Sequence, residues 1–192
     1  MNESVEQQQN KTELRRVLLK QRQSLPLEEW REKSDRICSH LKSSLLFTQS
    51  KTILAYFSFR QEPDLSPLFT DTQKRWGFPR CLGKSLSWHS WQPTEALQMG
   101  AYGILEPQVD SPILEPDAVN LILVPAVACD VRGYRLGYGG GYYDRLLSSS
   151  EWASKPTIGI VFAEAYFPHL PIEPWDIQLH HVCTDNGLRS HI

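Results

Sequence analysis

The sequence predicts an α/β protein in which a largely parallel sheet carries helices on both faces. Three short apolar runs at 52–57, 119–125 and 156–162, rich in β-branched residues, have the composition of strands buried on both sides. Helical patterns precede or separate these runs, and alternation of strands with helices is typical of parallel sheets. We therefore expect a three-layer αβα, Rossmann-like architecture, and the 192 residues suffice for one such domain.

Two helices are expected before the first strand. Apolar residues recur at helical spacing over residues 11–23, with basic residues on the opposite side. A second helix is predicted over 26–46, because its proline suits a first helical turn. Residues 1–10 are polar and offer nothing to bury, so we expect them to be a disordered tail, with residues 11–192 as the single domain.

Short elements are expected between the first and second buried strands. They are, in order, a polar loop at 58–63, a helix at 65–75, and strands at 76–80 and 86–91. Because residues 92–118 contain four prolines, that stretch is predicted to be mainly loop, with a short helix at 94–97. After the third buried strand, a loop at 163–176 and a final strand at 181–184 are predicted.

The most informative segment is the glycine-rich run 133–143, which follows the strand at 119–125 and leads into a helix predicted at 142–147. Glycines permit positive φ and let a ligand approach backbone N–H groups, although they lose extra chain entropy on folding. Unpaired N–H groups at a helix start favour phosphate. Arg135 and Arg145 add full charges that can bind a phosphate with paired hydrogen bonds. We therefore expect an anion here, in particular a nucleotide phosphate.

The glycine spacing matches neither of two well-known phosphate-binding patterns. No Lys-Ser/Thr pair follows the glycines, as a P-loop requires, and Gly137-x-Gly139-x-Gly141 lacks the Rossmann spacing. The alternative is a flexible turn over a sheet edge, which tolerates glycines without binding anything. The tyrosines, arginines and aspartates crowded around the turn favour a binding site over this alternative.

Composition narrows the functional classes. The net charge of −2 and pI near 6.3 give no general attraction to nucleic acid, although the helix at 11–23 has a basic surface. No apolar run approaches the roughly 20 residues of a membrane span, and the four scattered cysteines lack any C-x-x-C pair. We expect a cytoplasmic monomer with small-molecule partners and no nucleic-acid or membrane partner.

Three motifs around the glycine run carry a family resemblance. They are Val124-Pro-Ala-Val-Ala-Cys-Asp130, Gly133-x-Arg-Leu-Gly137 and Tyr138-Gly-Gly-Gly-Tyr-Tyr-Asp-Arg145. They closely resemble the signature of the 5-formyltetrahydrofolate cyclo-ligases, also called 5,10-methenyltetrahydrofolate synthetases. The resemblance extends to Lys11-x-x-x-Arg15, Glu62, Phe78-Pro-Arg80, Gly103-Ile-Leu-Glu-Pro107 and Pro174-x-Asp176. The chain departs from the family pattern at Tyr138, where many members have arginine, and at Gly140, where some have lysine.

The resemblance implies an ATP-dependent ligase that forms a C–N bond. Its expected reaction converts 5-formyltetrahydrofolate into 5,10-methenyltetrahydrofolate through a phosphorylated N5-iminium intermediate, with ADP and phosphate released. ATP would be the co-substrate and Mg²⁺ the required metal. Phosphoryl transfer depends on charge neutralisation and alignment more than on a protein nucleophile.

The motifs also imply residue roles. The implied ATP contacts are Lys11, Arg15, Arg135, Leu136, Gly137, Tyr138, Gly139, Gly140, Gly141, Tyr142 and Tyr143. The implied folate contacts are Phe57, Glu62, Tyr102 and Tyr142. Asp144 and Asp176 resemble Mg²⁺ carboxylates, a ligand type that suits this metal, and the implied catalytic residues are Arg135, Tyr142 and Asp144.

Structural interpretations of the same residues stay open. Lys11 and Arg15, four apart on a helix, would ordinarily form a solvated face. Asp144 would complement a helix dipole, Glu62 would cap a turn, and Phe57 would belong to the core. Two other functions also stay open: an ATP-dependent kinase or ligase with a different acceptor, and an RNA-associated module that uses the basic first helix. The slightly acidic overall balance counts against the RNA module.

Overall fold

The computed structural model describes residues 2–191, and its main element is a seven-stranded sheet. The strands are β1 (Thr52–Leu54), β2 (Arg75–Leu82), β3 (Ser85–Ser90), β6 (Leu121–Pro125), β9 (Thr157–Ile160), β11 (His181–Thr184) and β12 (Gly187–Ser190). Their order is β12-β11-β9-β6-β1-β2-β3. Strands β11, β9, β6, β1 and β2 run parallel, whereas β3 and β12 are antiparallel to their neighbours. The predicted α/β class with a largely parallel sheet is confirmed.

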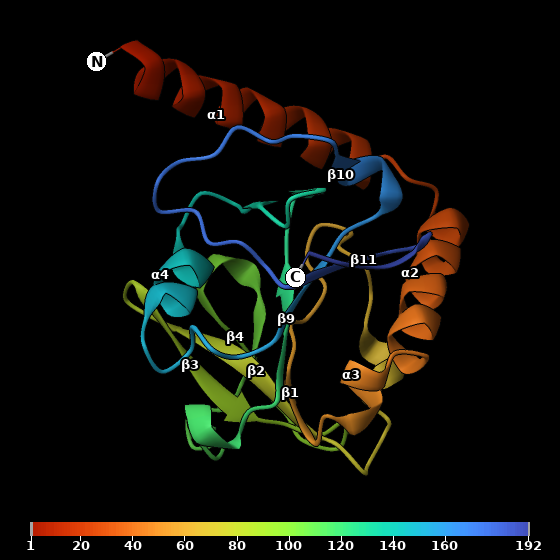
Figure 1. Cartoon of the computed structure of the whole chain (residues 1–192). Helices are drawn as coiled ribbons and strands as arrows, with labels where there is room; N and C mark the ends of the chain where they lie inside the picture. Colours follow the sequence, from red (N-terminus) through yellow and green to blue (C-terminus); the bar gives the residue numbers. More distant parts are fainter. Residues whose placement is uncertain (1, 192) are drawn as a thin grey trace.

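Helices cover both faces of the sheet, as alternate residues of β6 show. Leu121 and Leu123 point to a core shared with α2 (Leu27–Lys42) and α3 (Leu45–Gln49). Ile122 and Val124 point to a second core that includes Leu146 of α4 (Tyr142–Ser148). Figure 1 shows α2 and α3 on one side of the sheet and α4 on the other. Because both faces of β6 are buried, its sequence is a continuous apolar run.

The first helix, α1 (Asn2–Gln23), lies across the end of the sheet at which the parallel strands finish (Figure 1). A small sheet of β10 (Tyr166–Phe167), β7 (Ala128–Asp130) and β8 (Arg135–Leu136) lies beneath it. Leu14 and Leu18 of α1 pack there against Leu136 and Leu170. Strands β4 (Leu97–Met99) and β5 (Leu105–Pro107) form a separate antiparallel hairpin. Ligands of such sheets bind beyond the carboxyl ends of the strands, so α1 borders the expected binding site.

Several predicted elements differ from the structure near the chain start. Helix α1 begins at Asn2, so residues 2–10 are helical rather than the expected disordered tail; glutamine and glutamate are good helix formers. The helix predicted over 26–46 is two helices, because the Ser44 hydroxyl caps α3 by accepting a hydrogen bond from the Phe47 N–H at 3.2 Å.

Two further predicted helices are wrong. Of the helix at 65–75, only a 3₁₀ turn at Ser66–Leu68 forms, and a turn closed by the Asp71 carboxylate on the Gln73 N–H leads directly into β2. The helix at 94–97 is a turn in which the Glu95 carboxylate accepts from the Gln92 N–H. Local side-chain to backbone bonds therefore replace helical ones at both places. Among residues 2–191, no helix has the length and apolar character needed to cross a membrane.

Leu123, which is fully buried on the central strand, provides a test of the core. We expect Leu123→Ala to lower the free energy of unfolding by about 2–5 kcal/mol, because it removes buried methyl groups and leaves a cavity. Urea denaturation measures this change. Leu45→Ala is the control, since Leu45 is 74% exposed and its loss is expected to change stability by no more than about 0.5 kcal/mol. Equal effects of the two substitutions would contradict the packing described.

Candidate active site

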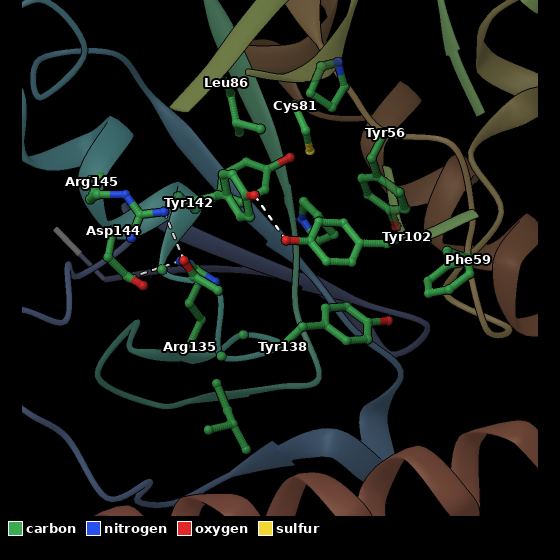
Figure 2. A pocket seen from close by; sticks show the side chains of 18 of the residues that line it. Tyr56, Phe59, Cys81, Leu86, Tyr102, Arg135, Tyr138, Tyr142, Asp144 and Arg145 are labelled. Carbon is green, nitrogen blue, oxygen red and sulfur yellow. Dashed lines mark hydrogen bonds and ion pairs between the residues drawn. The ribbon is translucent and has the colours of Figure 1, made fainter. Parts of the chain in front are cut away.

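A pocket of about 910 Å³ opens where α1, the loop after β1, the β4–β5 hairpin and the glycine loop converge. Figure 2 shows side chains of the loop after β1, the β4–β5 hairpin and the glycine loop around it. Every residue predicted for the site lines this pocket: Lys11, Arg15, Phe57, Glu62, Tyr102, Arg135, Leu136, Gly137, Tyr138, Gly139, Gly140, Gly141, Tyr142, Tyr143, Asp144 and Asp176. The loop after β1 and the glycine loop converge because parallel strands end at the same edge of the sheet, and α1, which carries Lys11 and Arg15, lies across that edge.

Three cations gather at one end of the pocket, and protein oxygens hold each of them. The Lys11 ammonium lies 2.5 Å from the Asp176 carboxylate, and Arg15 donates from Nε to the Gly137 carbonyl at 2.7 Å. Arg135 donates from Nη2 to Asp144 at 2.9 Å (Figure 2). Lys11 and Arg135 are only 6% and 8% exposed. The interpretation of Lys11 as part of a solvated face is therefore wrong.

The Arg135 side chain is fixed while part of its donor capacity stays unused. Its guanidinium lies over the Tyr143 ring, 5.3 Å from the centroid. Its buried Nε has no hydrogen-bond partner among the described residues, nor does the buried Tyr143 hydroxyl. Buried donors are nearly always satisfied, so these two groups mark a place where a ligand would supply acceptors.

The glycine loop brings bare backbone to the same end of the pocket. Gly139 and Gly141 have φ values of 98° and 65°, in the left-handed region that other residues adopt at a cost. A Cβ on Gly141 would come within 2.7 Å of the Arg145 Nη1. Gly141 immediately precedes α4, and no side chain caps that helix start. The loop can therefore present main-chain N–H groups to an anion.

The two carboxylates expected to bind metal have cations as neighbours. Asp144 pairs with Arg135 and Asp176 with Lys11. Among residues 2–191, no group of three or more His, Cys, Asp or Glu side chains could by itself hold a metal ion. Mg²⁺ commonly takes one or two protein carboxylates and completes its shell with phosphate oxygens and water. The donor set therefore fits a metal that arrives with a nucleotide.

Glu62 defines the other end of the pocket. It is 3% exposed, and its carboxylate accepts hydrogen bonds from the Tyr138 hydroxyl at 2.9 Å and from the Phe59 N–H at 3.1 Å. Burial raises its pKa to about 7, although nearby Arg22 and the two hydrogen bonds act in the opposite direction. Phe57, close by in the same loop, stacks on Phe78 with ring centroids 4.1 Å apart. This end combines an apolar wall with one polar acceptor.

Two tyrosines meet at the mouth of the pocket. The hydroxyls of Tyr102 and Tyr142 are 3.2 Å apart, and Tyr142 also donates to the Gly83 carbonyl at 3.0 Å (Figure 2). Tyr102 is 70% exposed and has a left-handed φ of 60°. The pair links the β4–β5 hairpin to the glycine loop, so both aromatic rings border the entrance.

Tyr138 is placed differently from its expected role. Its motif position implies a nucleotide contact, but Figure 2 shows its side chain pointing away from Arg135 toward Phe59. Its hydroxyl donates to Glu62 and accepts a hydrogen bond from Arg22. The sequence did not identify Arg22 or the buried Glu173 of the pocket wall, because nothing local distinguishes them from other charged residues.

The family model described as the 5-formyltetrahydrofolate cyclo-ligase family matches residues 7–185. The chain belongs to this family. The resemblance inferred from the motifs is therefore confirmed, and membership makes the protein an enzyme of the cyclo-ligase class, which argues against an RNA-associated module.

Individual cyclo-ligases agree with this assignment over most of their length. The chain is 31% identical over 188 residues to the 5-formyltetrahydrofolate cyclo-ligase of Mycolicibacterium smegmatis, covering 91% of this chain and 93% of the relative. It is 27% identical to that of Escherichia coli K12 over 175 residues, with 88% and 96% covered. The NMR structure of Aquifex aeolicus 5,10-methenyltetrahydrofolate synthetase superposes with a TM-score of 0.84 and 37% identity, over 94% of this chain and 92% of that one.

The raised pKa of Glu62 predicts how stability depends on pH. The folded state binds the proton more tightly than the unfolded chain, whose carboxyl has its ordinary pKa of 4.5. The protonated Glu62 carboxyl therefore makes its full contribution to the free energy of unfolding below pH 4.5. This contribution is lost as the pH rises through about 7. Relative to Glu62→Gln, the wild type should lose on the order of 3 kcal/mol of unfolding free energy across this window.

Urea denaturation of both proteins at several pH values measures this difference. Because other titrating groups are common to the two proteins, their contributions cancel in the comparison. A constant difference from acid to neutral pH would show that Glu62 titrates normally and is not buried as described.

Proposed function

We propose that the protein catalyses the ATP- and Mg²⁺-dependent cyclisation of 5-formyltetrahydrofolate to 5,10-methenyltetrahydrofolate, with release of ADP and phosphate. One observation carries this proposal: a single pocket joins buried cations and bare glycine backbone at one end to an apolar wall with a buried carboxylate at the other. The first end suits a triphosphate, and the second suits a flat heterocycle with N–H donors. Family membership supports the same pair of substrates.

The reaction is a ring closure that expels the formyl oxygen. That oxygen is a poor leaving group, so it first attacks the γ-phosphorus of ATP, and the bond from the γ-phosphorus to ADP breaks. The product is a phosphorylated iminium at N5. N10 then attacks the formyl carbon and gives up its proton, and loss of phosphate leaves the methenyl bridge between N5 and N10.

The cationic end of the pocket would stabilise the phosphoryl transfer. Lys11, Arg15 and Arg135 together with the glycine-loop amides would bind the triphosphate, and Arg135 would neutralise charge that develops on the transferred group. Arg135 suits this role because its guanidinium lies over the Tyr143 ring and its buried Nε has no partner among the described residues. Such fixed charges require little rearrangement during reaction.

Asp144 and Asp176 would hold Mg²⁺ together with the nucleotide oxygens. The metal would offset the negative charge of the phosphates during the transfer. When the nucleotide enters, phosphate oxygens become available to Arg135 and Lys11, so the two carboxylates can exchange these cations for the metal. Glu173, whose buried Oε1 lacks a partner among the described residues, adds negative charge on the same side of the pocket.

The opposite end would orient the folate. Glu62 in its ionised form would accept hydrogen bonds from the pterin N–H groups, while Phe57 and Tyr142 would contact the ring system. Tyr102, at the mouth, would cover the pterin once it is bound. These contacts would hold the formyl oxygen toward the γ-phosphate, and alignment of this kind accounts for a large share of enzymatic rate enhancement.

The direct test of the proposed reaction is incubation of the purified protein with 5-formyltetrahydrofolate, ATP and Mg²⁺. We expect the near-ultraviolet absorbance of methenyl-folate to increase, with one ADP formed for each product molecule. Omission of ATP or chelation of the metal should abolish the increase, because both are needed for the phosphoryl transfer. ADP formation without methenyl-folate, on supply of another acceptor, would instead identify a kinase or ligase of different specificity.

Substitution of Arg135 tests the assigned stabilisation of charge. We expect Arg135→Ala to lower turnover by about 10²–10³-fold, the usual effect of removing one preorganised charge donor. Arg31→Ala is the matched control, because Arg31 is an exposed arginine on α2 outside the pocket. Turnover of Arg135→Ala equal to that of the control, with both proteins folded, would remove Arg135 from the mechanism.

A further inference from the structure

Arg22 is a buried arginine of α1 that does not line the pocket, yet its guanidinium contacts three segments around it. It is 9% exposed. Its Nε donates to the Arg60 carbonyl at 3.0 Å, its Nη1 to the Ala126 carbonyl at 3.2 Å, and its Nη2 to the Tyr138 hydroxyl. The three acceptors belong to the loop after β1, the end of β6 and the glycine loop. Only arginine presents several donors in a rigid planar fork of this kind.

The loop that carries Glu62 has an unusual backbone. Arg60 and Gln61 are consecutive residues other than glycine with left-handed φ values of 49° and 53°. Such conformations are disfavoured and persist only where surrounding contacts hold them, and they occur preferentially at functional sites. Glu62 follows directly, so this strained turn sets the direction of its side chain.

Residues of the first two helices and their connection hold this turn. Besides the bond from Arg22 to Arg60, the Gln61 side chain donates to the Leu25 carbonyl at 3.2 Å. The Trp30 indole N–H donates to the Glu62 carbonyl at 2.9 Å. The corner between α1 and α2 therefore fixes the backbone on both sides of the Glu62 side chain.

The side chain of Glu62 is held from the same direction. Arg22 donates to the Tyr138 hydroxyl, which in turn donates to Glu62 Oε1. The Arg22 guanidinium also lies over the Tyr138 ring, 5.6 Å from its centroid. A cation thus polarises the hydroxyl that binds the carboxylate, so the three groups form one connected chain.

We propose that Arg22 and Tyr138 are positioning residues that hold Glu62 in the orientation and ionisation state needed to bind the pterin. The proposal rests on the proposed function and assigns Tyr138 to the folate side of the pocket instead of the nucleotide side. Arg22 supplies the positive charge at this place through its contact with Tyr138.

The charged and titratable groups around Glu62 determine whether a pH dependence of folate binding near neutral pH can be assigned to Glu62. Arg22 is the cation beside it, and Tyr56, Tyr138 and Tyr143 are the other titratable neighbours. Burial raises the pKa of each of these tyrosines above its ordinary value of 10.0, so they are neutral near neutral pH. Of these groups, Glu62 is therefore the one expected to change charge near neutral pH. The hydrogen bond from Tyr138 favours its ionised form, and loss of that bond raises its pKa further.

Tyr138→Phe and Arg22→Lys test the proposal. The first removes only the hydroxyl, and the second keeps the charge but loses the fork. Binding of 5-formyltetrahydrofolate and of ATP is measured separately by calorimetry, across pH and without turnover. For each variant we expect the folate Kd to rise about tenfold, as for one hydrogen bond to a charged group, with the ATP Kd unchanged. In Tyr138→Phe, the weakening of folate binding that accompanies protonation of Glu62 should begin at a higher pH than in the wild type.

Arg16→Ala is the matched control, because Arg16 is an exposed arginine of the same helix that pairs with Glu13. It should leave both Kd values and the pH profile unchanged. If Arg22 and Tyr138 had a purely structural role, the variants would have a lower unfolding midpoint and would bind folate and ATP equally less tightly. The pH dependence of folate binding would not shift. This outcome would overturn the proposal. So would an unchanged folate Kd, or a loss confined to ATP. A wild-type protein that does not bind folate at all would refute the proposed function and this inference together.

Discussion

The attachment of α1 across the carboxyl ends of the parallel strands is the constraint on which the rest of the structure depends. Without that helix, the glycine loop and the loop after β1 would lie at an open end of the sheet, joined by the hydrogen bond from Tyr138 to Glu62. Lys11, Arg15 and Arg22 fasten it by polar contacts to Asp176, Gly137 and Tyr138, respectively. Leu14 and Leu18 add apolar packing against the small sheet. One helix thereby becomes a wall shared by both ends of the pocket.

This arrangement explains how the fold accommodates the buried cations Lys11, Arg22 and Arg135. Burial of an unpaired charge is costly, and Lys11, Arg15 and Arg135 each have a protein oxygen as acceptor. Those acceptors are two carboxylates and a carbonyl, whose place phosphate oxygens could take. In the proposed function, the pairs Lys11–Asp176 and Arg135–Asp144 would be preformed halves of a nucleotide and metal site.

Much of the fold, and which residues line the pocket, could be predicted from the sequence because local sequence patterns indicate them. The run at 119–125 was apolar on both sides, as burial under two helical layers requires. Glu62 and the glycine loop came together because both follow parallel strands of one sheet. The prediction of a helix at 65–75 was wrong because the periodicity of apolar residues does not reveal the turn around Asp71. A side-chain to backbone hydrogen bond closes that turn.

The Arg22–Tyr138–Glu62 chain could not be predicted in the same way. Arg22 and Tyr138 are 116 positions apart, and the first helix also carries Lys11, Arg15, Arg16 and Lys20. Sequence spacing assigns all of these to one basic surface, whereas the fold buries Lys11 and Arg22 and leaves Arg16 exposed. Which basic residue meets which acceptor is decided by tertiary packing, and only coordinates provide it.

The central claim is that both substrates occupy one pocket in reacting alignment. A crystal structure of the protein with 5-formyltetrahydrofolate and a non-hydrolysable ATP analogue tests this most directly. We predict the triphosphate against Arg135 and the glycine loop, the pterin against Glu62, and the formyl oxygen in line with the γ-phosphorus. A structure in which either ligand lies outside this pocket, or in which the formyl group points away from the γ-phosphate, would contradict the account.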